Sequence, residues 1–291
     1  MSKASNSVNS NRFNYSRVHL YAKEYVDNIY ASLNSLAEKR TNFVMPCLER
    51  ILEAFSFERL GTHHFSSFTG YAHGDQGREV IDRIFARVLG AEKATVRVQF
   101  VSGTHAITAS LFGVLRPGDC LLSVTGTPYD TLEEVIGIRG DGQGSLKDFG
   151  ISYQEIDVFK EENINFELLD KALKDEIKLV FIQRSCGYSW RSSMSIEQIR
   201  ILCEYIHNYN PNIVCFVDNC YGEFVEGKEP CAVGADLMAG SLIKNLGGTI
   251  APSGGYIAGK KELVDQACYR LTSPGIGSAG GGGFDLNRLV L

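Results

Sequence analysis

The strongest constraint on the fold is a series of short apolar runs that alternate with helical patterns between residues 95 and 259. The runs TVRVQFVS, KLVFIQRS and NIVCFVD are rich in β-branched residues, and segments with apolar residues at helical spacing lie between such runs. Strands that lack polar alternation are buried on both faces, as in a parallel sheet covered by helices. The sequence therefore predicts an α/β fold with a mostly parallel seven-stranded sheet.

Composition and charge exclude several classes of protein. The 291 residues are 44% hydrophobic and 22% charged, which is typical of a globular protein. The net charge is −5 and no basic run occurs, so we expect no nucleic-acid partner. No uncharged apolar run approaches the roughly 20 residues of a membrane helix, so we expect no membrane association. Residues 1–14 lack the apolar core of a secretory signal, so we expect a cytoplasmic protein, with an organelle left open.

The eight cysteines indicate a reducing compartment. They are scattered, they form no C-x-x-C pair, and several lie inside apolar runs. Buried free thiols explain this pattern better than disulfides do. Neither the cysteines nor His63, His64 and His73 have the spacing of metal ligands, so we expect no metal site. We expect these histidines to form hydrogen bonds in a loop or at an interface.

The chain divides into three segments by its residue patterns. Residues 1–60 predict an N-terminal arm followed by helices that connect near Pro46. Residues 61–265 predict a large α/β domain that binds the ligand, and this domain begins with a long loop at 61–78. Residues 266–291 predict the start of a C-terminal domain.

A turn of small residues follows the strand predicted at 95–102. Ser102, Gly103 and Thr104 lead directly into the next helical pattern. Free N–H groups at the positive end of a helix can bind a phosphate, although an ordinary turn has the same composition. The chain carries neither the G-x-x-x-x-G-K-[ST] motif nor the G-x-G-x-x-G motif, which disfavours a nucleotide-binding Rossmann protein.

Three other candidate residues follow predicted strands, and parallel sheets bind ligands beyond the carboxyl ends of their strands. Tyr129 either stacks on a planar ligand or packs on the next helix. Arg184 either binds an anionic ligand or pairs with a neighbouring acid. Asp218 ends an apolar strand, where a carboxylate needs a cationic partner, or else it caps a helix.

Lys244 lies in an apolar stretch that is followed by two glycines. Burial would lower the pKa of its amine and make it a usable nucleophile, and the alternative is a solvated loop lysine. A phosphate seat, an aromatic ring, a carboxylate and a reactive lysine are together what pyridoxal 5′-phosphate requires. The sequence therefore predicts a pyridoxal-phosphate site.

Longer motifs extend this prediction, and they are FTGYAHGDQGR, FVSGTHA, TGTPYDTLEEVIG, IQRSCGYSWR, VDNCYGEFVE and GSLIKNLGGTIAPSGGYIAG. Through these motifs the chain resembles, from about Phe13 onward, the fold-type I pyridoxal-phosphate enzymes, which have the PLP-dependent transferase-like fold. More closely, it resembles the cystathionine/methionine gamma-lyase-related family that includes aluminium-resistance proteins. The resemblance implies pyridoxal 5′-phosphate as the cofactor.

The resemblance also implies a role for each matched residue. Lys244 would form the Schiff base and move protons on the substrate, and Asp218 would pair with the pyridine nitrogen. Tyr129 would stack on the ring and act in catalysis by assisting departure of the leaving group. The residues that would bind the phosphate are Ser102, Gly103, Thr104 and Ser241. In the related lyases a neighbouring subunit completes this site, and Tyr71 and Arg78 are the candidates here, so we expect a homodimer or a homotetramer.

The implied reaction is β- or γ-elimination on a sulfur amino acid such as cystathionine, methionine or cysteine. The alternatives are an aminotransferase-like enzyme on the same fold and a non-catalytic cofactor-binding fragment or pseudoenzyme. Fold-type I enzymes carry a small C-terminal domain whose arginine holds the substrate carboxylate, and this chain ends soon after Lys244. We therefore expect a truncated form with weak or no lyase activity, in which Arg184 and Arg288 are the remaining candidates for holding the substrate.

Overall fold

The structure is a computed structural model that describes residues 15–68, 71–160, 163–174, 176–248, 250–282 and 290–291. The chain forms two compact units, Met1–Pro46 and Cys47–Leu291, and each is described by itself. Helix α1 (Tyr15–Phe57) begins in the first unit and ends in the second. The sequence predicts separate helices that connect near Pro46, whereas the structure has one continuous helix. A proline inside a helix removes one backbone hydrogen bond without forcing the helix to end, and here the helix continues.

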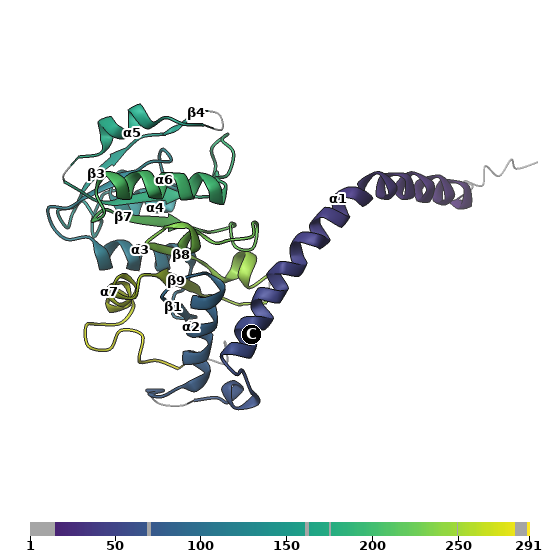
Figure 1. Ribbon diagram of the computed structural model, residues 1–291, viewed down its shortest axis with the longest axis horizontal. Coiled ribbons are helices and arrows are strands. Elements are labelled where there is room, and N and C mark those ends of the chain that lie inside the picture. Colours follow the sequence, from purple (N-terminus) through teal and green to yellow (C-terminus); the bar gives the residue numbers. More distant parts are fainter. Residues whose placement is uncertain (1–14, 69–70, 161–162, 175, 249, 283–289) are drawn as a thin grey trace, which may run out of the picture. The chain divides into compact units, whose positions relative to one another are not determined.

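The second unit is built around a seven-stranded sheet, labelled in Figure 1. Its strands are β1 (Lys93–Arg97), β2 (Cys120–Ser123), β3 (Ser152–Glu155), β6 (Ile177–Gln183), β7 (Val214–Asp218), β8 (Leu237–Ser241) and β9 (Gly255–Gly259). Their spatial order is β1-β9-β8-β7-β6-β2-β3. The neighbours from β8 to β3 are parallel, and β9 is antiparallel to β1 and β8. The predicted mostly parallel seven-stranded sheet is therefore confirmed. A separate hairpin pairs β4 (Phe159–Lys160) with β5 (Asn163–Ile164).

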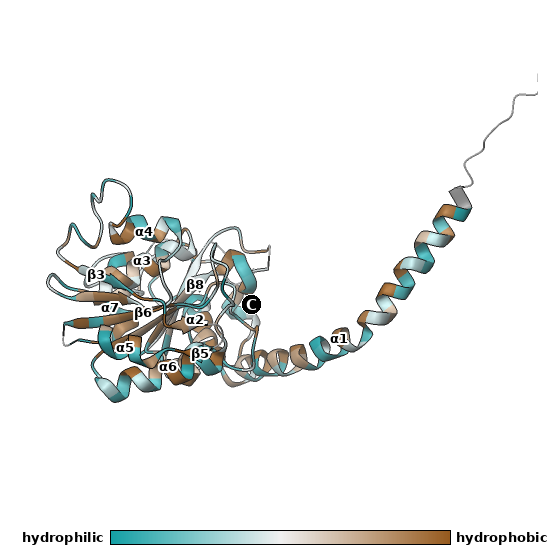
Figure 2. Cartoon of the chain, turned by 90° about the horizontal axis from the view of Figure 1, so that it is seen from above, coloured by the Kyte–Doolittle hydropathy of each residue, from teal (hydrophilic) through white to brown (hydrophobic). Residues whose placement is uncertain are grey.

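Helices cover both faces of the sheet. They are α2 (Gln76–Val88), α3 (Gly103–Val114), α4 (Asp130–Ile136), α5 (Phe166–Ala172), α6 (Ile196–Tyr209) and α7 (Lys261–Leu271). Figure 2 shows α3 and α4 on one side of the sheet and α5 and α6 on the other. Along β7, Val214 and Phe216 pack into the core cluster that contains α3, α4 and α7, whereas Cys215 and Val217 pack into the cluster that contains α2, α5 and α6. Burial on both faces is the reason that this strand is apolar throughout.

Short helical turns occupy parts of the chain that the sequence pattern leaves irregular. They are η1 (Thr62–Phe65), η2 (Pro230–Val233) and η3 (Leu242–Leu246). The loop predicted at 61–78 contains η1 and the first turn of α2, where the Asp75 carboxylate accepts a hydrogen bond from the Arg78 backbone N–H at 3.0 Å. The Gly61 N–H donates to His64 Nδ1 at 3.0 Å, so the predicted hydrogen bonding is confirmed for this histidine.

Helix α7 runs across residue 265 and packs closely on α3, and the predicted division at this residue stays a prediction. A Cβ atom on Gly113 of α3 would lie 2.6 Å from the Ala267 Cα, so only glycine permits this approach. Arg288 lies outside the described residues. Within the described ranges, no helix is both long and apolar enough to cross a membrane. The cysteines all lie in described parts of the chain and are free thiols, as predicted.

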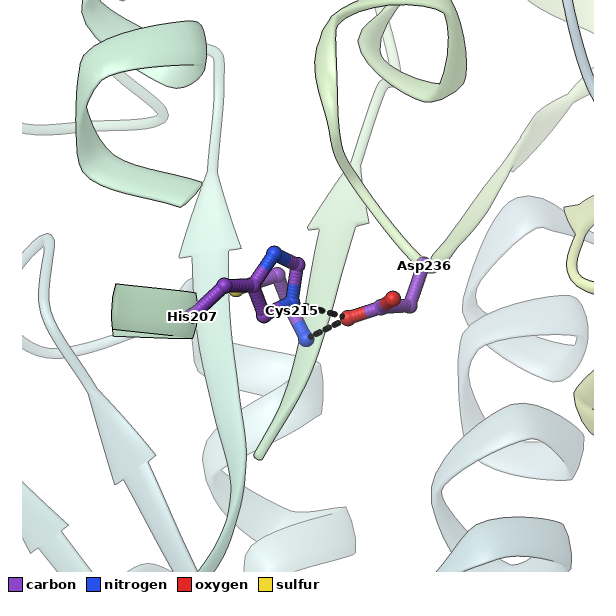
Figure 3. A group of neighbouring side chains, drawn as sticks. All are labelled: His207, Cys215 and Asp236. Carbon is purple, nitrogen blue, oxygen red and sulfur yellow. Dashed lines mark hydrogen bonds and ion pairs between the residues drawn. The ribbon is translucent and has the colours of Figure 1, made fainter. Parts of the chain in front are cut away.

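A buried carboxylate joins several elements at the edge of the sheet where β7 and β8 begin (Figure 3). Asp236 Oδ2 lies 2.8 Å from His207 Nε2 and accepts a hydrogen bond from the Cys215 N–H at 2.7 Å, and Oδ1 pairs with Lys260 Nζ at 2.7 Å. Burial alone would raise the pKa of Asp236, but these three partners lower it overall. The side-chain atoms of His207, Cys215 and Asp236 that could bind a metal ion lie within 4.8 Å of one another, a spacing that metal ligands also have. Both carboxylate oxygens already have partners, so we interpret the cluster as structural.

Replacing Asp236 with Asn should destabilise the chain at about pH 7 more than at about pH 3. A carboxylate with a lowered pKa in the folded chain contributes stability above the unfolded pKa of about 3.9, and loses it as the pH falls through the folded value. Urea unfolding of both proteins at the two pH values measures this difference. Asp141→Asn, in an exposed loop, serves as the control. Equal destabilisation by Asp236→Asn at both pH values would contradict the electrostatic role.

Candidate active site

A cavity of about 280 Å³ lies at the carboxyl ends of β6, β7 and β8, where parallel sheets bind ligands. Its lining residues are Ser102, Gly103, Thr104, Tyr129, Gln183, Ser185, Gly187, Tyr188, Asp218, Cys220, Tyr221, Ser241, Ile243 and Lys244. The structure thus brings together Lys244, the two residues predicted to contact the cofactor ring, and the four predicted to bind its phosphate. Those six residues are Asp218, Tyr129, Ser102, Gly103, Thr104 and Ser241. These residues are distant in the sequence and meet because their strands end at one edge of the sheet.

The amino terminus of α3 forms one wall of the cavity. Ser102 is the N-cap residue, and its hydroxyl accepts a hydrogen bond from the His105 N–H at 3.1 Å. The N–H groups of a first helical turn have no partner within their own helix, and they carry the positive end of its dipole. A Cβ atom on Gly103 would lie 2.9 Å from the Ser241 Cβ and 3.1 Å from the Cys220 sulfur. Glycine is therefore needed for this close approach, and the predicted role of Gly103 and Thr104 in binding an anion stays a prediction.

Asp218 ends β7 and is buried. Its Oδ1 accepts a hydrogen bond from the Cys220 N–H at 3.0 Å. Burial raises the pKa of the carboxyl, while the Cys220 amide and thiol and the positive charge of Lys244 oppose that shift. Asp218 is thus a buried acid whose pKa responds to the charge of Lys244, and its predicted role toward a ligand stays a prediction.

Lys244 lies in η3, where the backbone departs from helical geometry at this residue. Its amine is half-buried and lies 4.2 Å from the centre of the Tyr221 ring, a cation–π contact worth about 0.5–2 kcal/mol. The expectation of a lowered pKa is wrong. Burial by itself lowers the pKa of Lys244, but the Cys220 thiol, the Tyr221 hydroxyl and the Asp218 carboxylate outweigh it and raise the pKa. The amine is therefore an ammonium at neutral pH.

Tyr129 connects the first turn of α3 to the end of β6. Its hydroxyl donates to the Thr104 hydroxyl oxygen at 3.0 Å, and its backbone N–H donates to Gln183 Oε1 at 3.2 Å. Burial raises the pKa of the Tyr129 hydroxyl, with a further contribution from the charge of Asp218. Tyr129 is therefore a neutral phenol that lines the cavity beside the first turn of α3.

Several lining residues were missed by the strand-end analysis, above all Gln183, Cys220 and Tyr221. Burial raises the pKa of the Cys220 thiol, the charge of Asp218 adds to this shift, and the charge of Lys244 opposes it. Tyr221 has a φ of 68°, a left-handed conformation that is uncommon for a residue other than glycine. A signal was present in the sequence, because Cys220 and Tyr221 lie two and three residues after Asp218 in the motif VDNCYGEFVE.

Arg184 lies outside the cavity lining, although it follows β6 directly. Its guanidinium donates to Asn219 Oδ1 at 2.8 Å and to the Gly222 carbonyl at 2.7 Å, and it lies 3.8 Å from Glu229. Arg184 is buried, and these contacts fix the turn that follows β7. These contacts favour the alternative in which Arg184 pairs with neighbouring acids, here Glu226 and Glu229, over the alternative in which it binds a substrate carboxylate.

Tyr71 and Arg78 also lie outside this cavity. The Arg78 side chain is buried, and its guanidinium donates to the carbonyls of Gly281 and Ala279 at 2.9 Å each. Burial lowers the pKa of Arg78, and Arg97 adds to this effect. Tyr71, by contrast, is 82% exposed. A role of either residue in the site of a second copy remains a prediction.

Comparison with known proteins identifies the relatives of this chain. The model of the methionine gamma-lyase family matches residues 22–291. A protein of Bacillus subtilis named YnbB, itself uncharacterized, is 50% identical over 233 residues, which are 80% of this chain and 55% of that protein. An L-methionine gamma-lyase of Treponema denticola is 23% identical over 240 residues, which are 81% of this chain and 55% of that enzyme.

Solved structures include close neighbours. A carbon–sulfur lyase involved in aluminium resistance from Clostridium novyi has a TM-score of 0.85 and 45% identity, with 94% of this chain and 65% of that chain covered. A Bacillus cereus protein has a TM-score of 0.88 and 44% identity, with 91% and 66% covered. The chain thus spans about half the length of its sequence relatives and about two thirds of these structures.

Replacing Gly103 with Ala should weaken binding of pyridoxal 5′-phosphate roughly tenfold or more, a loss of about 1.4 kcal/mol. The added methyl group would push the first turn of α3 away from Ser241 and Cys220, and so displace the N–H groups that we expect to bind the phosphate. A fluorescence titration of the cofactor measures the dissociation constant. Gly227→Ala is the matched control, because a Cβ there would meet open space. Unchanged affinity in Gly103→Ala would contradict the anion site.

Proposed function

The chain belongs to the methionine gamma-lyase family, and on this premise we propose that it is a pyridoxal-phosphate-dependent carbon–sulfur lyase. The observation that carries the proposal is a single cavity in which the first turn of α3, the Asp218 carboxylate and the Lys244 amine meet. An anion seat, a buried acid and an amine are the three groups that this cofactor needs from its protein.

The residues of the cavity fit the cofactor. Gly103 and Thr104 would bind the phosphate with their N–H groups, and Gly103 is the residue whose missing side chain leaves the space beside Ser241. Asp218 would hold the proton of the pyridine nitrogen, since a buried carboxylate needs a cationic partner. Tyr129 would pack on the ring. When bound, pyridoxal 5′-phosphate withdraws electrons from the substrate Cα and so makes its proton acidic.

Lys244 is the residue that we assign to proton transfer. Its amine would take the proton from the substrate Cα, after which the bond from carbon to sulfur breaks and the sulfur leaves as a thiol. The Tyr221 ring, which contacts the amine, would orient it. Hydrolysis then leaves an oxo acid and ammonia as the other products. The raised pKa of Lys244 means that the amine must lose its own proton before it can act as a base.

The substrate that we propose is a small sulfur amino acid such as cystathionine, methionine or cysteine. Tyr188 and Ile243 line the cavity with apolar surface suited to a thioether, and Ser185 adds a polar group. We further propose that a second copy of the chain contributes the exposed Tyr71, as the family resemblance implies.

Replacing Lys244 with Ala should abolish covalent attachment of the cofactor. We expect the wild-type chain mixed with pyridoxal 5′-phosphate to be yellow, and borohydride to fix the cofactor to the peptide that contains Lys244, as read by mass spectrometry. Lys228→Ala, which removes an exposed lysine, is the control. A label on a different lysine, or a Lys244→Ala chain that is still labelled, would refute the assignment. This test concerns the cofactor alone and does not require turnover.

Replacing Asp218 with Asn should leave the fold intact and slow elimination by roughly 100-fold or more, as does the loss of one preorganised electrostatic group in other enzymes. The amide cannot balance the charge of a protonated pyridine nitrogen. Thiol release and oxo-acid formation from cystathionine, methionine and cysteine are measured for both proteins, and the ratio of the two rates is the result, because the wild-type rate itself is expected to be low. Formation of the oxo acid without a thiol would instead indicate transamination. A mild effect of Asp218→Asn would assign Asp218 to a structural role.

A further inference from the structure

Glu223 is a second buried acid behind the candidate active site, and the mechanism above does not use it. Its side chain is 1% exposed, and its Oε1 accepts a hydrogen bond from the Tyr256 hydroxyl at 2.9 Å. Its Oε2 is buried and finds no hydrogen-bond partner among the residues that the structure describes. A buried carboxylate oxygen without a partner is costly, so the position needs an explanation other than stability.

The surrounding backbone makes room for this carboxylate. Tyr221 and Phe224, on either side of Gly222 and Glu223, both have left-handed backbone angles, with φ values of 68° and 56°. A Cβ atom on Gly240 of β8 would lie 2.6 Å from Glu223 Oε1, so only glycine fits there. Strained backbone of this kind is concentrated at functional sites.

Two sets of contacts connect Glu223 to the cavity. Asn245, next to Lys244, donates from Nδ2 to the backbone carbonyls of Tyr221 and Glu223 at 3.0 Å each. The Tyr256 hydroxyl, which binds Glu223, also accepts from Asn219 Nδ2 at 3.2 Å, and Asn219 directly follows Asp218. Glu223 therefore anchors the turn between Asp218 and the segment that carries Lys244.

The charged groups around Glu223 are mainly acidic. Asp218 and Cys220 face it from the end of β7, Tyr256 from β9, and Glu229 from the start of η2. The nearby cations Arg184 and Arg50 pair with Glu229, at 3.8 and 3.5 Å. Burial raises the pKa of Glu223 to about 7, the Tyr256 hydrogen bond opposes this shift, and the charges of Glu229 and Asp218 add to it.

We propose that Glu223 is a positioning residue whose charge is coupled to cofactor binding at Asp218. The inference rests on the proposed function. Without the cofactor, the negative charge of Asp218 disfavours a second negative charge on the buried Glu223. Glu223 therefore keeps its proton to a higher pH than it does when the cofactor is bound. A protonated pyridine nitrogen at Asp218 neutralises that carboxylate, relieves the repulsion and releases the proton of Glu223. By linkage, the affinity for the cofactor must rise as the pH rises through the neutral range.

The test is the dissociation constant of pyridoxal 5′-phosphate as a function of pH for the wild-type chain and Glu223→Gln. The amide mimics the protonated acid, so the two proteins should bind alike at low pH. Between about pH 6 and about pH 8, the affinity of both proteins for the cofactor should change. The increase should be roughly fivefold larger for the wild-type chain than for Glu223→Gln, which is the low end of measured couplings between two sites. The cofactor itself titrates in this range, and the comparison between the two proteins cancels that contribution.

Tyr256→Phe separates the charge of Glu223 from its structural role. This variant removes the hydrogen bond to Glu223 but keeps the carboxyl group, so the pH-dependent gain should persist and move to higher pH. A purely structural Glu223 would make Tyr256→Phe and Glu223→Gln behave alike, and that result would overturn the proposal.

A second measurement covers the case in which Glu223→Gln does not fold. Infrared difference spectra of the wild-type chain near neutral pH should lose the C=O stretch of a protonated carboxylic acid when the cofactor is added. Retention of that band, or parallel pH profiles for wild type and Glu223→Gln, would overturn the coupling while leaving the proposed function intact. Failure of the wild-type chain to bind pyridoxal 5′-phosphate at any pH would instead refute the proposed function.

Discussion

The candidate active site depends on the hydrogen-bonded register of β6, β7 and β8. This parallel ladder pairs Gln183 with Asp218 and Asp218 with Ala239, so β6 and β7 end at one level and β8 ends two residues farther along, at Ser241. Their carboxyl ends therefore deliver Asp218, Ser241 and Lys244 to the same cavity. A shift of one residue in the register of β7 would turn Asp218 to the other face of the sheet. The apolar residues on both faces of β7 resist such a shift, because they fill two different core clusters.

Three buried acids lie near this end of the sheet, and they differ in how many partners stabilise them. They are Asp218, Glu223 and Glu229. Glu229 has hydrogen bonds from Phe224 and Asn219 in addition to its two arginine partners, as a structural ion-pair network requires. Asp218 has the Cys220 amide and lies close to Lys244. Glu223 has one hydrogen bond and a buried oxygen without a partner in the described structure. Acids that are stabilised less than their burial demands are typical of sites built to receive a charged ligand.

Sequence patterns predicted the positions of the strands well, but they predicted the properties of individual side chains less well. The apolar runs locate the strands because a strand buried on both faces tolerates few polar residues. Pro46 misled the helix prediction, because α1 continues through it. Lys244 misled the pKa prediction, because Cys220, Tyr221 and Asp218 come from another strand end and outweigh burial. Arg184 follows its strand as a ligand-binding residue would, yet the polar groups that bind its guanidinium, Asn219 and Gly222, follow β7.

By itself, the sequence determined the α/β class, the mostly parallel sheet and the short list of strand-end residues, because periodicity and turn composition are local properties of the chain. The packed structure was needed to show which of those residues share a cavity, that Arg184 is held by Asn219 and Gly222 instead, and that Glu223 is buried. These outcomes depend on distances between atoms of different strands and on the water that packing removes from around them. Burial and neighbouring charge set the proton affinity of each group, and both arise only when the strands are assembled.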